Sequence, residues 1–227
     1  MVRHGESRWN LCDRFTGWVD VPLSEYGVKE AQLCAIHCKD FDFNAAFTSN
    51  LGRAYETLLI ILSQQDRTAI TQHEENPQYR RWVRLSNQCG TDDLPVFKTA
   101  IMNERFYGKL QGMEKSAAER QFGKEKVFSW RRGFFDRPPG GETLKETFDR
   151  VHPYFARNIL SRVRRGEDVL VAGHGNTLRA IVKHLEKFKD GEVLFLDLPQ
   201  GQPLVYTYKR GKFMRTSGEF AFDRPLR

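Results

Sequence analysis

The chemistry that this sequence suggests depends on two histidines, His4 and His174, each placed beside glycine. His4 lies in the run Arg-His-Gly-Glu-Ser at residues 3–7, and His174 lies in Ala-Gly-His-Gly-Asn at residues 172–176. An apolar run at residues 169–171 precedes His174 and an apolar-periodic segment begins at Thr177, which predicts a strand end, a tight turn and a helix start. Because the carboxyl ends of strands in an open α/β sheet face one crevice, we expect both histidines at a single site.

Phosphoryl transfer is the reaction that such a site suits. A neutral imidazole is a capable nucleophile near pH 7, and a backbone carbonyl in the glycine turn can hold its second nitrogen. The transferred group spreads negative charge over its oxygens, so it needs fixed cations, preferably arginines that meet phosphate with two donors. Arg3 lies beside His4, and Arg53 lies at the start of a predicted helix. We therefore expect Arg3, Arg53 and His174 to form a positive cradle around His4.

The reaction also needs a group that moves the proton of the substrate hydroxyl. Glu104 follows a predicted strand and is the best-placed carboxylate for that task. The alternative for Glu104 is a salt bridge to its neighbour Arg105.

Strands alternate with helices along the chain, which predicts a three-layer α/β/α sandwich with a mostly parallel central sheet. We expect strands at Val2 and at residues 45–48, 95–99, 169–171, 193–196 and 204–208, the last turning at residues 210–211 into a hairpin. We expect helices at residues 25–38 (capped by Ser24), 54–62, 115–122, 125–132, 144–165 and 177–185, with a kink at Pro153.

The length of 227 residues suits a single domain, residues 1–227. Between about residues 64 and 94 the sequence becomes polar and aperiodic, which predicts a surface insertion with too few apolar positions to bury.

Composition narrows the function class. The net charge is +7, with 36 Lys and Arg against 29 Asp and Glu, which favours phosphorylated acids or polyanions as partners. Because the basic residues are dispersed and no recognition motif appears, we expect no nucleic-acid partner. No charged-then-apolar leader opens the chain and the longest apolar run covers residues 58–62, so we expect a cytoplasmic protein without a membrane partner. Cys34 and Cys38 lie one helical turn apart, as buried helix residues or as half of a zinc site would.

Further motifs continue the pattern along nearly the whole chain. They are Trp9-Asn10 after the first histidine run, Arg-Phe-Thr-Gly-Trp at residues 14–18, Leu23-Ser24, Phe-Thr-Ser at residues 47–49, Asn-Glu-Arg at residues 103–105 with Tyr107-Gly108, Trp-Arg-Arg at residues 130–132, and Leu178-Arg179 after the second histidine run. Together they resemble the cofactor-dependent phosphoglycerate mutases of the histidine phosphatase superfamily. The Arg-His-Gly motif is shared by the whole superfamily, whereas Lys115, Arg131-Arg132 and residues 103–105 mark the mutase branch.

The resemblance implies the roles of individual residues. His4 would become a phosphohistidine primed by 2,3-bisphosphoglycerate, and Glu104 would act as acid and base, without a metal. The implied neighbours of the transferred phosphoryl group are Arg3, Arg53, Asn10, His174 and the Gly175 backbone; those of the remaining phosphate or carboxylate are Thr16, Gly17, Tyr107, Lys115, Arg131 and Arg132; and Ser7 and Asn176 are further substrate-binding residues. The implied reaction interconverts 3-phosphoglycerate and 2-phosphoglycerate, with bisphosphoglycerate phosphatase and synthase side activities. A homo-oligomer is a further expectation.

The sequence also departs from that family. The loop between Arg132 and Glu142 is shorter than in the larger mutases, and residues 215–227 lack the acidic tail that closes over the site in many relatives. Because water hydrolyses phosphohistidine where closure is incomplete, we expect a raised bisphosphatase side activity.

Three alternatives stay open at this point. One is a phosphatase of the same superfamily that acts on another small phosphorylated metabolite, which would need His4, Arg3, Arg53 and His174 but not Lys115 or the Arg131-Arg132 pair. The second is a non-enzymatic nucleic-acid-binding module, which only the basic balance suggests. The third is a metal-dependent mutase, for which the sequence offers neither a set of Asp and His ligands nor a serine nucleophile.

Overall fold

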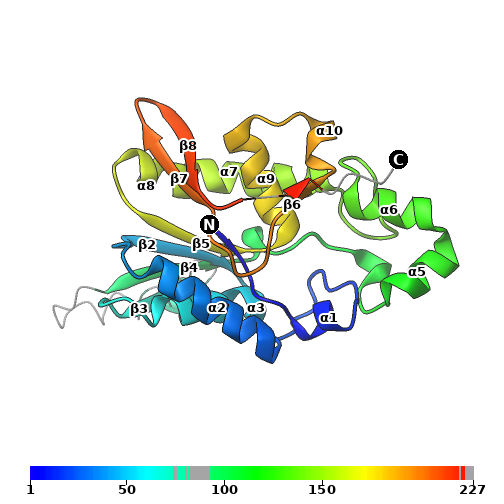
Figure 1. Ribbon diagram of the computed structural model, residues 1–227, viewed down its shortest axis with the longest axis horizontal. Coiled ribbons are helices and arrows are strands. Elements are labelled where there is room, and N and C mark those ends of the chain that lie inside the picture. Colours follow the sequence, from blue (N-terminus) through cyan, green and yellow to red (C-terminus); the bar gives the residue numbers. More distant parts are fainter. Residues whose placement is uncertain (74–75, 80, 82–92, 220, 223–227) are drawn as a thin grey trace.

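The computed structural model describes residues 1–73, 76–79, 81, 93–219 and 221–222. At its centre lies a five-stranded sheet in the order β1-β5-β2-β4-β3, in which every pair of neighbours is parallel. The strands are β1 (Val2–Arg3), β2 (Ala45–Ser49), β3 (Ala69–His73), β4 (Leu94–Thr99) and β5 (Val169–Gly173). Figure 1 shows helices on both faces of this sheet. The prediction of a mostly parallel α/β/α sandwich is therefore confirmed.

Alternation along the strands builds two separate hydrophobic cores. On β2, Ala46 packs into the core that includes Cys34 of α2 (Glu25–Cys38) and Leu58 of α3 (Gly52–Leu62). Phe47, the next residue, packs on the opposite face, in the core formed with α7 (Leu144–Tyr154) and α9 (Gly175–Glu186). Because successive strand side chains point to opposite faces, buried apolar residues follow one another along these central strands.

Side-chain caps fix where the main helices begin. Ser24 accepts a hydrogen bond from the Gly27 N–H at 3.0 Å, so α2 begins at Glu25, as predicted. Thr143 and Glu146 form a reciprocal capping box before α7. The helix expected at residues 144–165 changes to a π-helical segment, η4 (Phe155–Leu160), just after Pro153, and ends as α8 (Ser161–Arg164). Proline lacks the N–H of a regular helical turn, which explains a change of register there.

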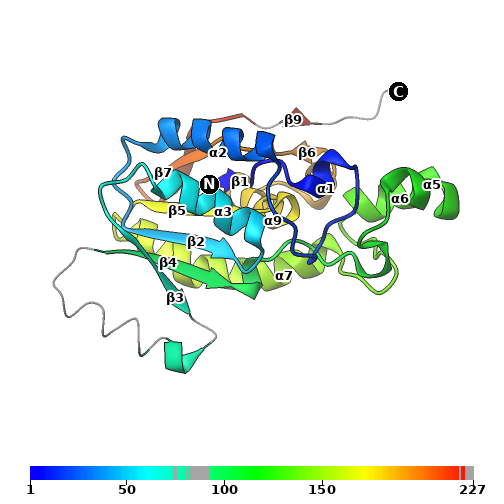
Figure 2. The same ribbon diagram turned by 90° about the horizontal axis from the view of Figure 1, so that it is seen from below.

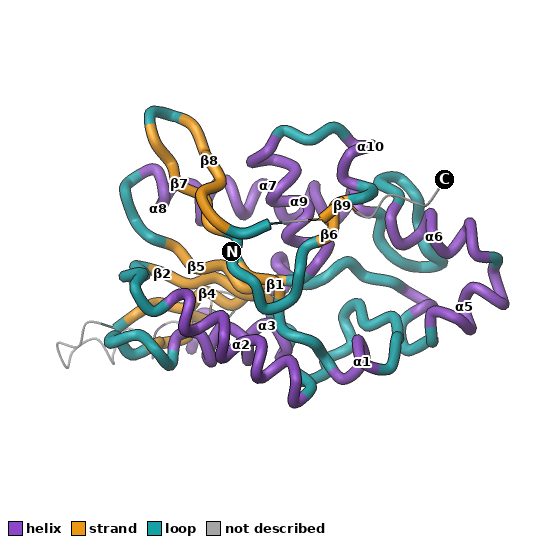
Figure 3. The backbone as a smooth tube through the Cα atoms, viewed as in Figure 1, coloured by secondary structure: helices purple, strands orange, loops and turns teal. Residues whose placement is uncertain are grey.

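The remaining elements include two small antiparallel sheets, which are separate from the central sheet. The remaining elements are α1 (Arg8–Leu11), η2 (Ala100–Met102), η3 (Gly108–Leu110), α5 (Lys115–Phe122), α6 (Lys124–Arg132), α10 (Asp190–Val193), β6 (Leu196–Asp197), β7 (Val205–Lys209), β8 (Lys212–Ser217) and β9 (Ala221–Phe222). In the two small sheets, β6 pairs with β9 and β7 pairs with β8. The α5–α6 pair lies at one end of the molecule, beyond α1 (Figure 3). Within the described ranges no helix is both long and apolar enough to cross a membrane.

Two sequence-based expectations about elements are wrong. Part of the polar segment at about residues 64–94 is a strand, β3, which pairs in parallel with β4 from Ala69 opposite Leu94 to His73 opposite Lys98; Figure 2 shows it at the edge of the sheet. An edge strand is covered less than a central one, so it lacks the apolar run that predicts a buried strand. Residues 74–75, 80 and 82–92 of that segment lie outside the described residues.

The second correction concerns residues 193–196, expected to be a strand. Val193 ends α10, and β6 covers only Leu196–Asp197. The Lys189 N–H donates to the Glu192 carboxylate at 2.7 Å, which caps the short helix α10. The apolar run at residues 193–196 suggested a strand instead.

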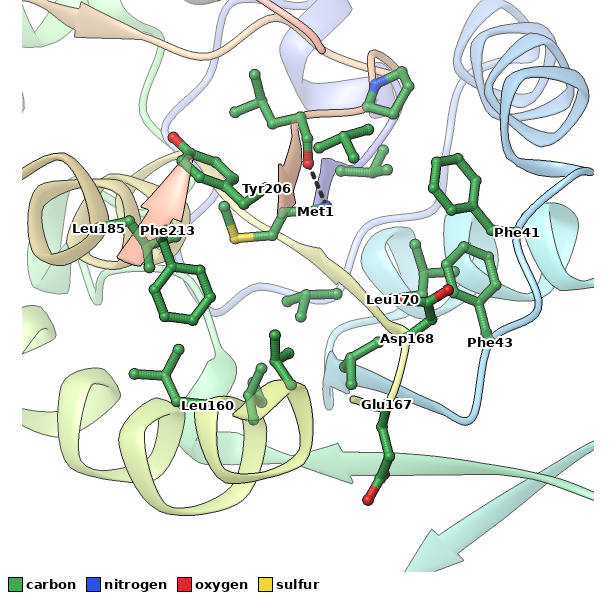
Figure 4. A pocket seen from close by; sticks show the side chains of 18 of the residues that line it. Met1, Phe41, Phe43, Leu160, Glu167, Asp168, Leu170, Leu185, Tyr206 and Phe213 are labelled. Carbon is green, nitrogen blue, oxygen red and sulfur yellow. Dashed lines mark hydrogen bonds between the residues drawn. The ribbon is translucent and has the colours of Figure 1, made fainter. Parts of the chain in front are cut away.

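An apolar cavity of about 110 Å³ lies beside β5, next to the two-residue β1. Its lining includes Phe41, Phe43, Leu160 and Phe213, and the Met1 amine at its edge donates to the Leu204 carbonyl at 2.8 Å (Figure 4). This lining is mostly apolar, whereas a second cavity, at the carboxyl ends of the strands, is lined by His4 and several basic side chains.

Candidate active site

The ends of β1 and β5 bring the two histidines together. The His4 N–H donates to the Gly173 carbonyl at 2.9 Å, which holds His4 beside the residue that follows β5, His174. The centroids of the two imidazole rings are 5.1 Å apart. The two glycine-flanked histidines thus lie side by side, as their positions at strand ends predicted.

The hydrogen bonds of His4 fix its tautomer, with the proton on Nδ1 and the lone pair on Nε2. Nδ1 lies 2.7 Å from the Gly5 carbonyl oxygen, which can only accept, so Nδ1 carries the proton. Nε2 accepts a hydrogen bond from Arg53 Nε at 3.3 Å. Burial, together with the charges of Arg53 and Arg3, holds the pKa of His4 well below its usual range. His4 is therefore neutral at pH 7, with the Nε2 lone pair on the side of Arg53.

His174 is fully buried, and its ring lies edge-on to that of His4. Its Nε2 is 2.7 Å from the hydroxyl of Ser49, at the end of β2, and its Nδ1 has no hydrogen-bond partner among the described residues. Burial and the charge of Arg53 hold the pKa of His174 well below its usual range. A neutral His174 can therefore serve an anion at His4 as a hydrogen-bond donor, from Nδ1 when that nitrogen carries the proton.

Arg53 and Arg3 supply fixed positive charge around His4. Arg53 also donates to the carbonyls of Val19 at 3.0 Å and Gly17 at 2.8 Å, so its guanidinium is held on three sides. Burial lowers the pKa of Arg53 to about 10, which still leaves it charged at pH 7. Arg3 donates from Nη1 to the Leu198 carbonyl at 2.7 Å, but its buried Nε finds no acceptor among the described residues. Buried donors without acceptors are costly, and an anion would satisfy this one.

Glu104 lies at the N-terminus of α9, where a carboxylate is electrostatically favoured. Its Oε1 accepts from the backbone N–H of Asn176 at 3.2 Å and of Arg105 at 2.7 Å. The guanidinium of Arg105 donates instead to the carbonyls of Trp130 and Arg131. Among the described side chains Glu104 and Arg105 form no ion pair, so the alternative of a simple salt bridge is not supported.

A cavity of about 150 Å³ opens in front of His4, and its lining is strongly basic. Seven cationic side chains and two carboxylates line it: Arg3, Arg14, Arg53, Lys115, Arg131, Arg132 and Arg179, with Glu104 and Asp197. Of the other residues expected in the site, it also contains Asn10, Thr16, Gly17, Tyr107, Gly175 and Asn176. The buried Thr16 hydroxyl, like Arg3 Nε, has no partner among the described residues. This lining fits a compact ligand with more than one anionic group.

Two of the expected site residues, His174 and Ser7, do not line the cavity. His174 is the buried neighbour of His4, and Ser7 lies at the start of α1. Ser7 is buried and caps α1, accepting from the Asn10 N–H at 3.2 Å and donating to Asn10 Oδ1 at 2.8 Å. Gln200 also donates to Asn10 Oδ1, at 3.1 Å. The oxygen of Asn10 is thereby occupied, and its amide hydrogens are what it can offer to a ligand.

Three charged cavity residues were missed in the sequence: Arg14, Arg179 and Asp197. Arg179 lies three residues after Asn176 on α9, and its Nη1 donates to Asn176 Oδ1 at 3.3 Å. That i, i+3 spacing could have identified it. Asp197 directly follows the strand expected at residues 193–196, and nothing in the sequence there marks it as part of the site.

The alternative of a zinc site at the cysteines finds no further support. The thiols of Cys34 and Cys38 lie 4.0 Å apart in the core under α2. In the part of the chain that the structure describes, no three His, Cys, Asp or Glu side chains gather as metal ligands would.

Comparison with known sequences agrees with this geometry. The profile of the histidine phosphatase superfamily (branch 1) matches residues 1–76 and 80–216. The 2,3-bisphosphoglycerate-dependent phosphoglycerate mutase 1 of Gloeobacter violaceus is 42% identical over 221 residues, which is 94% of this chain and 94% of that protein. The protein of the same name from Methanococcus vannielii is 43% identical over 206 residues, covering 90% of this chain and 88% of its own.

Solved structures show the same fold at much lower identity. The alpha-ribazole phosphatase from Shigella flexneri superimposes with a TM-score of 0.71 at 20% identity, covering 98% of this chain and 94% of that one. Bacillus stearothermophilus YhfR gives a TM-score of 0.71 at 22% identity, with 94% and 92% covered.

Proposed function

The chain belongs to branch 1 of the histidine phosphatase superfamily, and from that premise we propose that it is a 2,3-bisphosphoglycerate-dependent phosphoglycerate mutase. It acts on a small phosphorylated acid and interconverts 3-phosphoglycerate and 2-phosphoglycerate. The observation that carries this proposal is the state of His4: a neutral ring whose Nε2 lone pair lies beside Arg53, at the wall of a cavity lined by seven cations.

The residues around His4 fit a bisphosphorylated acid. Arg3 Nε and the Thr16 hydroxyl are buried without partners among the described residues, and an acid with two anionic groups would satisfy one with each group. When bound, 2,3-bisphosphoglycerate supplies the phosphoryl group that loads His4. Arg3, Arg53, Asn10, His174 and the Gly175 backbone would hold that group, and their fixed positions would stabilise the charge that it carries in transfer.

In the proposed cycle, His4 and Glu104 divide the chemistry. Nε2 of His4 attacks phosphorus, a P–N bond forms and the P–O bond to the donor oxygen breaks. The 2-hydroxyl of 3-phosphoglycerate then takes the phosphoryl group from His4 while the carboxylate of Glu104 accepts the hydroxyl proton. After the bound acid has turned round, its 3-phosphate returns to His4, and Glu104 gives the proton to the leaving oxygen. Protons and phosphoryl groups are thus conserved over one turnover.

The far side of the cavity would hold the anionic groups that do not react. Lys115, Arg131 and Arg132 come from α5 and α6, and Tyr107, Thr16 and Gly17 come from the loops between these helices and His4. We assign these residues, with Asn176, to the remaining phosphate and carboxylate. Ser7 would act through Asn10, whose side chain it holds.

The test is a coupled assay of 3-phosphoglycerate conversion with and without added 2,3-bisphosphoglycerate, on the wild type and on His4→Ala. We expect conversion that depends on the primer and that His4→Ala abolishes, together with an acid-labile phosphate on the wild type in rapid-quench labelling. Conversion that survives in His4→Ala would remove His4 as the nucleophile.

The same preparation distinguishes the remaining alternatives. A phosphatase for another metabolite would release inorganic phosphate from a panel of phosphorylated compounds without isomerising 3-phosphoglycerate. A metal-dependent mutase would lose activity in chelator and resist vanadate. The ratio of bisphosphatase to mutase rates measures the expected hydrolytic side activity, and a negligible ratio would contradict that expectation.

We also propose that residues 1–227 act as one domain in the cytoplasm, without nucleic-acid or membrane partners. We propose that the chain forms a homo-oligomer. Light scattering on the purified chain measures the molecular mass of the assembly and tests this.

A further inference from the structure

A carboxylate, Asp197, lies among the arginines on the wall of the cavity. Its Oδ1 is 3.5 Å from Arg179 Nη2 and 3.8 Å from Arg132 Nη1. The Asp197 side chain is 43% exposed, whereas those of Arg179 and Arg132 are 9% and 13% exposed. One buried and one largely buried guanidinium group thus share a single carboxylate, which lines the cavity.

Asp197 is not what holds Arg179 in place. Arg179 donates from Nε to the Leu196 carbonyl at 2.6 Å and from Nη1 to Asn176 Oδ1 at 3.3 Å. The ion pair with Asp197 is longer than either bond, so its contribution is mainly charge. Burial and the charge of Arg132 lower the pKa of Arg179 to about 9, which leaves it protonated at pH 7.

We propose that Asp197 is a specificity-determining residue that competes with the anionic groups of the ligand for Arg132 and Arg179. Its negative charge weakens the binding of every anion in the cavity, and it weakens the binding of the most highly charged ligand most. Asp197 thereby keeps the bisphosphorylated acid from being held far more tightly than the monophosphorylated substrate. This inference rests on the proposed function only for the choice of ligands.

The physical argument is that repulsion scales with ligand charge. Coulomb energy is proportional to the product of the charges, and the partly buried wall of the cavity screens it less than water does. Inorganic phosphate, 3-phosphoglycerate and 2,3-bisphosphoglycerate carry increasing negative charge at pH 7. Replacing Asp197 by the nearly isosteric asparagine removes one negative charge and leaves the bonds of Arg179 to Leu196 and Asn176 available.

The experiment measures dissociation constants of these three anions by titration calorimetry, at low and high salt, for the wild type and three variants. For Asp197→Asn we expect about threefold tighter binding of inorganic phosphate and about tenfold tighter binding of 3-phosphoglycerate. We expect a larger gain for 2,3-bisphosphoglycerate, and gains that shrink as salt is added. Asp197→Glu keeps the charge and should bind all three within about twofold of the wild type.

The matched control is Asp190→Asn. Asp190 is similarly exposed, at 48%, and pairs with Lys183 at 2.9 Å on α9, outside the cavity lining. It should change none of the three constants. Weaker binding of all three anions by Asp197→Asn would show that Asp197 only supports the arginines and would overturn the proposal, as would a gain independent of ligand charge. Because these are binding constants, the proposal can succeed or fail whether or not the chain isomerises 3-phosphoglycerate.

Discussion

Arg53 shows how one side chain can set both the position and the electrostatics of the nucleophile. Its Nε donates to His4 Nε2, while its two Nη atoms donate to the carbonyls of Gly17 and Val19. The planar guanidinium therefore links the ring of His4 to the loop that contains Gly17 and Val19. Its charge also helps to hold the pKa of His4 low, so that the ring enters the reaction neutral.

Lysine cannot make this set of bonds, so Arg53→Lys separates charge from geometry. Its ammonium keeps the positive charge but lacks the fixed fork that reaches His4, Gly17 and Val19 together. We expect kcat/KM for 3-phosphoglycerate to fall by about a hundred- to a thousandfold in a steady-state assay.

The control for Arg53→Lys is Arg67→Lys. Arg67 also bridges backbone carbonyls, those of Phe43 at 2.8 Å and Asp93 at 3.1 Å, but it lies outside the cavity lining. We expect Arg67→Lys to lower stability and to leave kcat/KM within about threefold of the wild type. Equal losses of activity in both variants would show that the reaction does not depend on the bonds that the Arg53 guanidinium makes to His4, Gly17 and Val19.

At the scale of elements, the first turn of α2 packs directly against the loop that carries His4. A Cβ on Gly27 would lie 2.0 Å from the Glu6 carbonyl oxygen, and a Cβ on Gly5 would lie 2.3 Å from the Gly27 carbonyl oxygen. Both contacts are between backbones, which cannot turn aside as a flexible side chain can. The two glycines thus allow the loop after β1 to lie against α2. This contact helps to fix the position of His4, which precedes Gly5 in that loop.

Gly27→Ala should therefore lower the free energy of unfolding, whereas glycine-to-alanine substitutions inside helices usually raise it. Alanine in place of glycine usually stabilises a helix by about 1 kcal/mol, but here the methyl group must displace the Glu6 backbone. We expect unfolding in urea to show a loss of about 1–3 kcal/mol, with kcat/KM reduced at least about tenfold because His4 moves.

Gly191→Ala, in α10, is the matched helical control. Nothing lies within 4 Å of a Cβ there, so we expect unchanged activity and unchanged or slightly higher stability. If Gly27→Ala were as stable and active as Gly191→Ala, the loop would not depend on this contact.

The elements that carry the site were predictable because their signals are local. The apolar run before His174 and the cap at Ser24 depend on neighbours in the sequence, and the structure has both β5 and α2 where they were expected. β3 was not predictable in this way, because an edge strand is defined by its pairing with β4 rather than by an apolar run. Asp197, on β6, belongs to the site through tertiary contacts with Arg132 of α6 and Arg179 of α9.

At the scale of the whole molecule, the site couples the stability of the fold to pH. His4 and His174 are buried, and the pKa of each lies well below the usual value near 6.5, first because of burial and then because of Arg53. In the unfolded chain both rings take up a proton as the pH falls through about 6.5, whereas in the folded chain they stay neutral. The unfolded state then binds more protons, so acid favours unfolding. The stability is fully present above the unfolded pKa and is lost as the pH falls below it.

We therefore expect the free energy of unfolding, measured with urea, to be lower at pH 5.5 than at pH 7.5, by up to about 1.4 kcal/mol for each buried histidine. The pKa of His184 is also lowered, by burial and by His152, so the wild-type loss alone does not isolate the site. The comparison that does is His174→Gln, which removes one of the titrating rings and should lose about 1.4 kcal/mol less than the wild type over the same interval. A loss of stability in His174→Gln as large as that in the wild type would mean that His174 accepts a proton in the folded protein. That result would contradict the conclusion that His174 is neutral in the site.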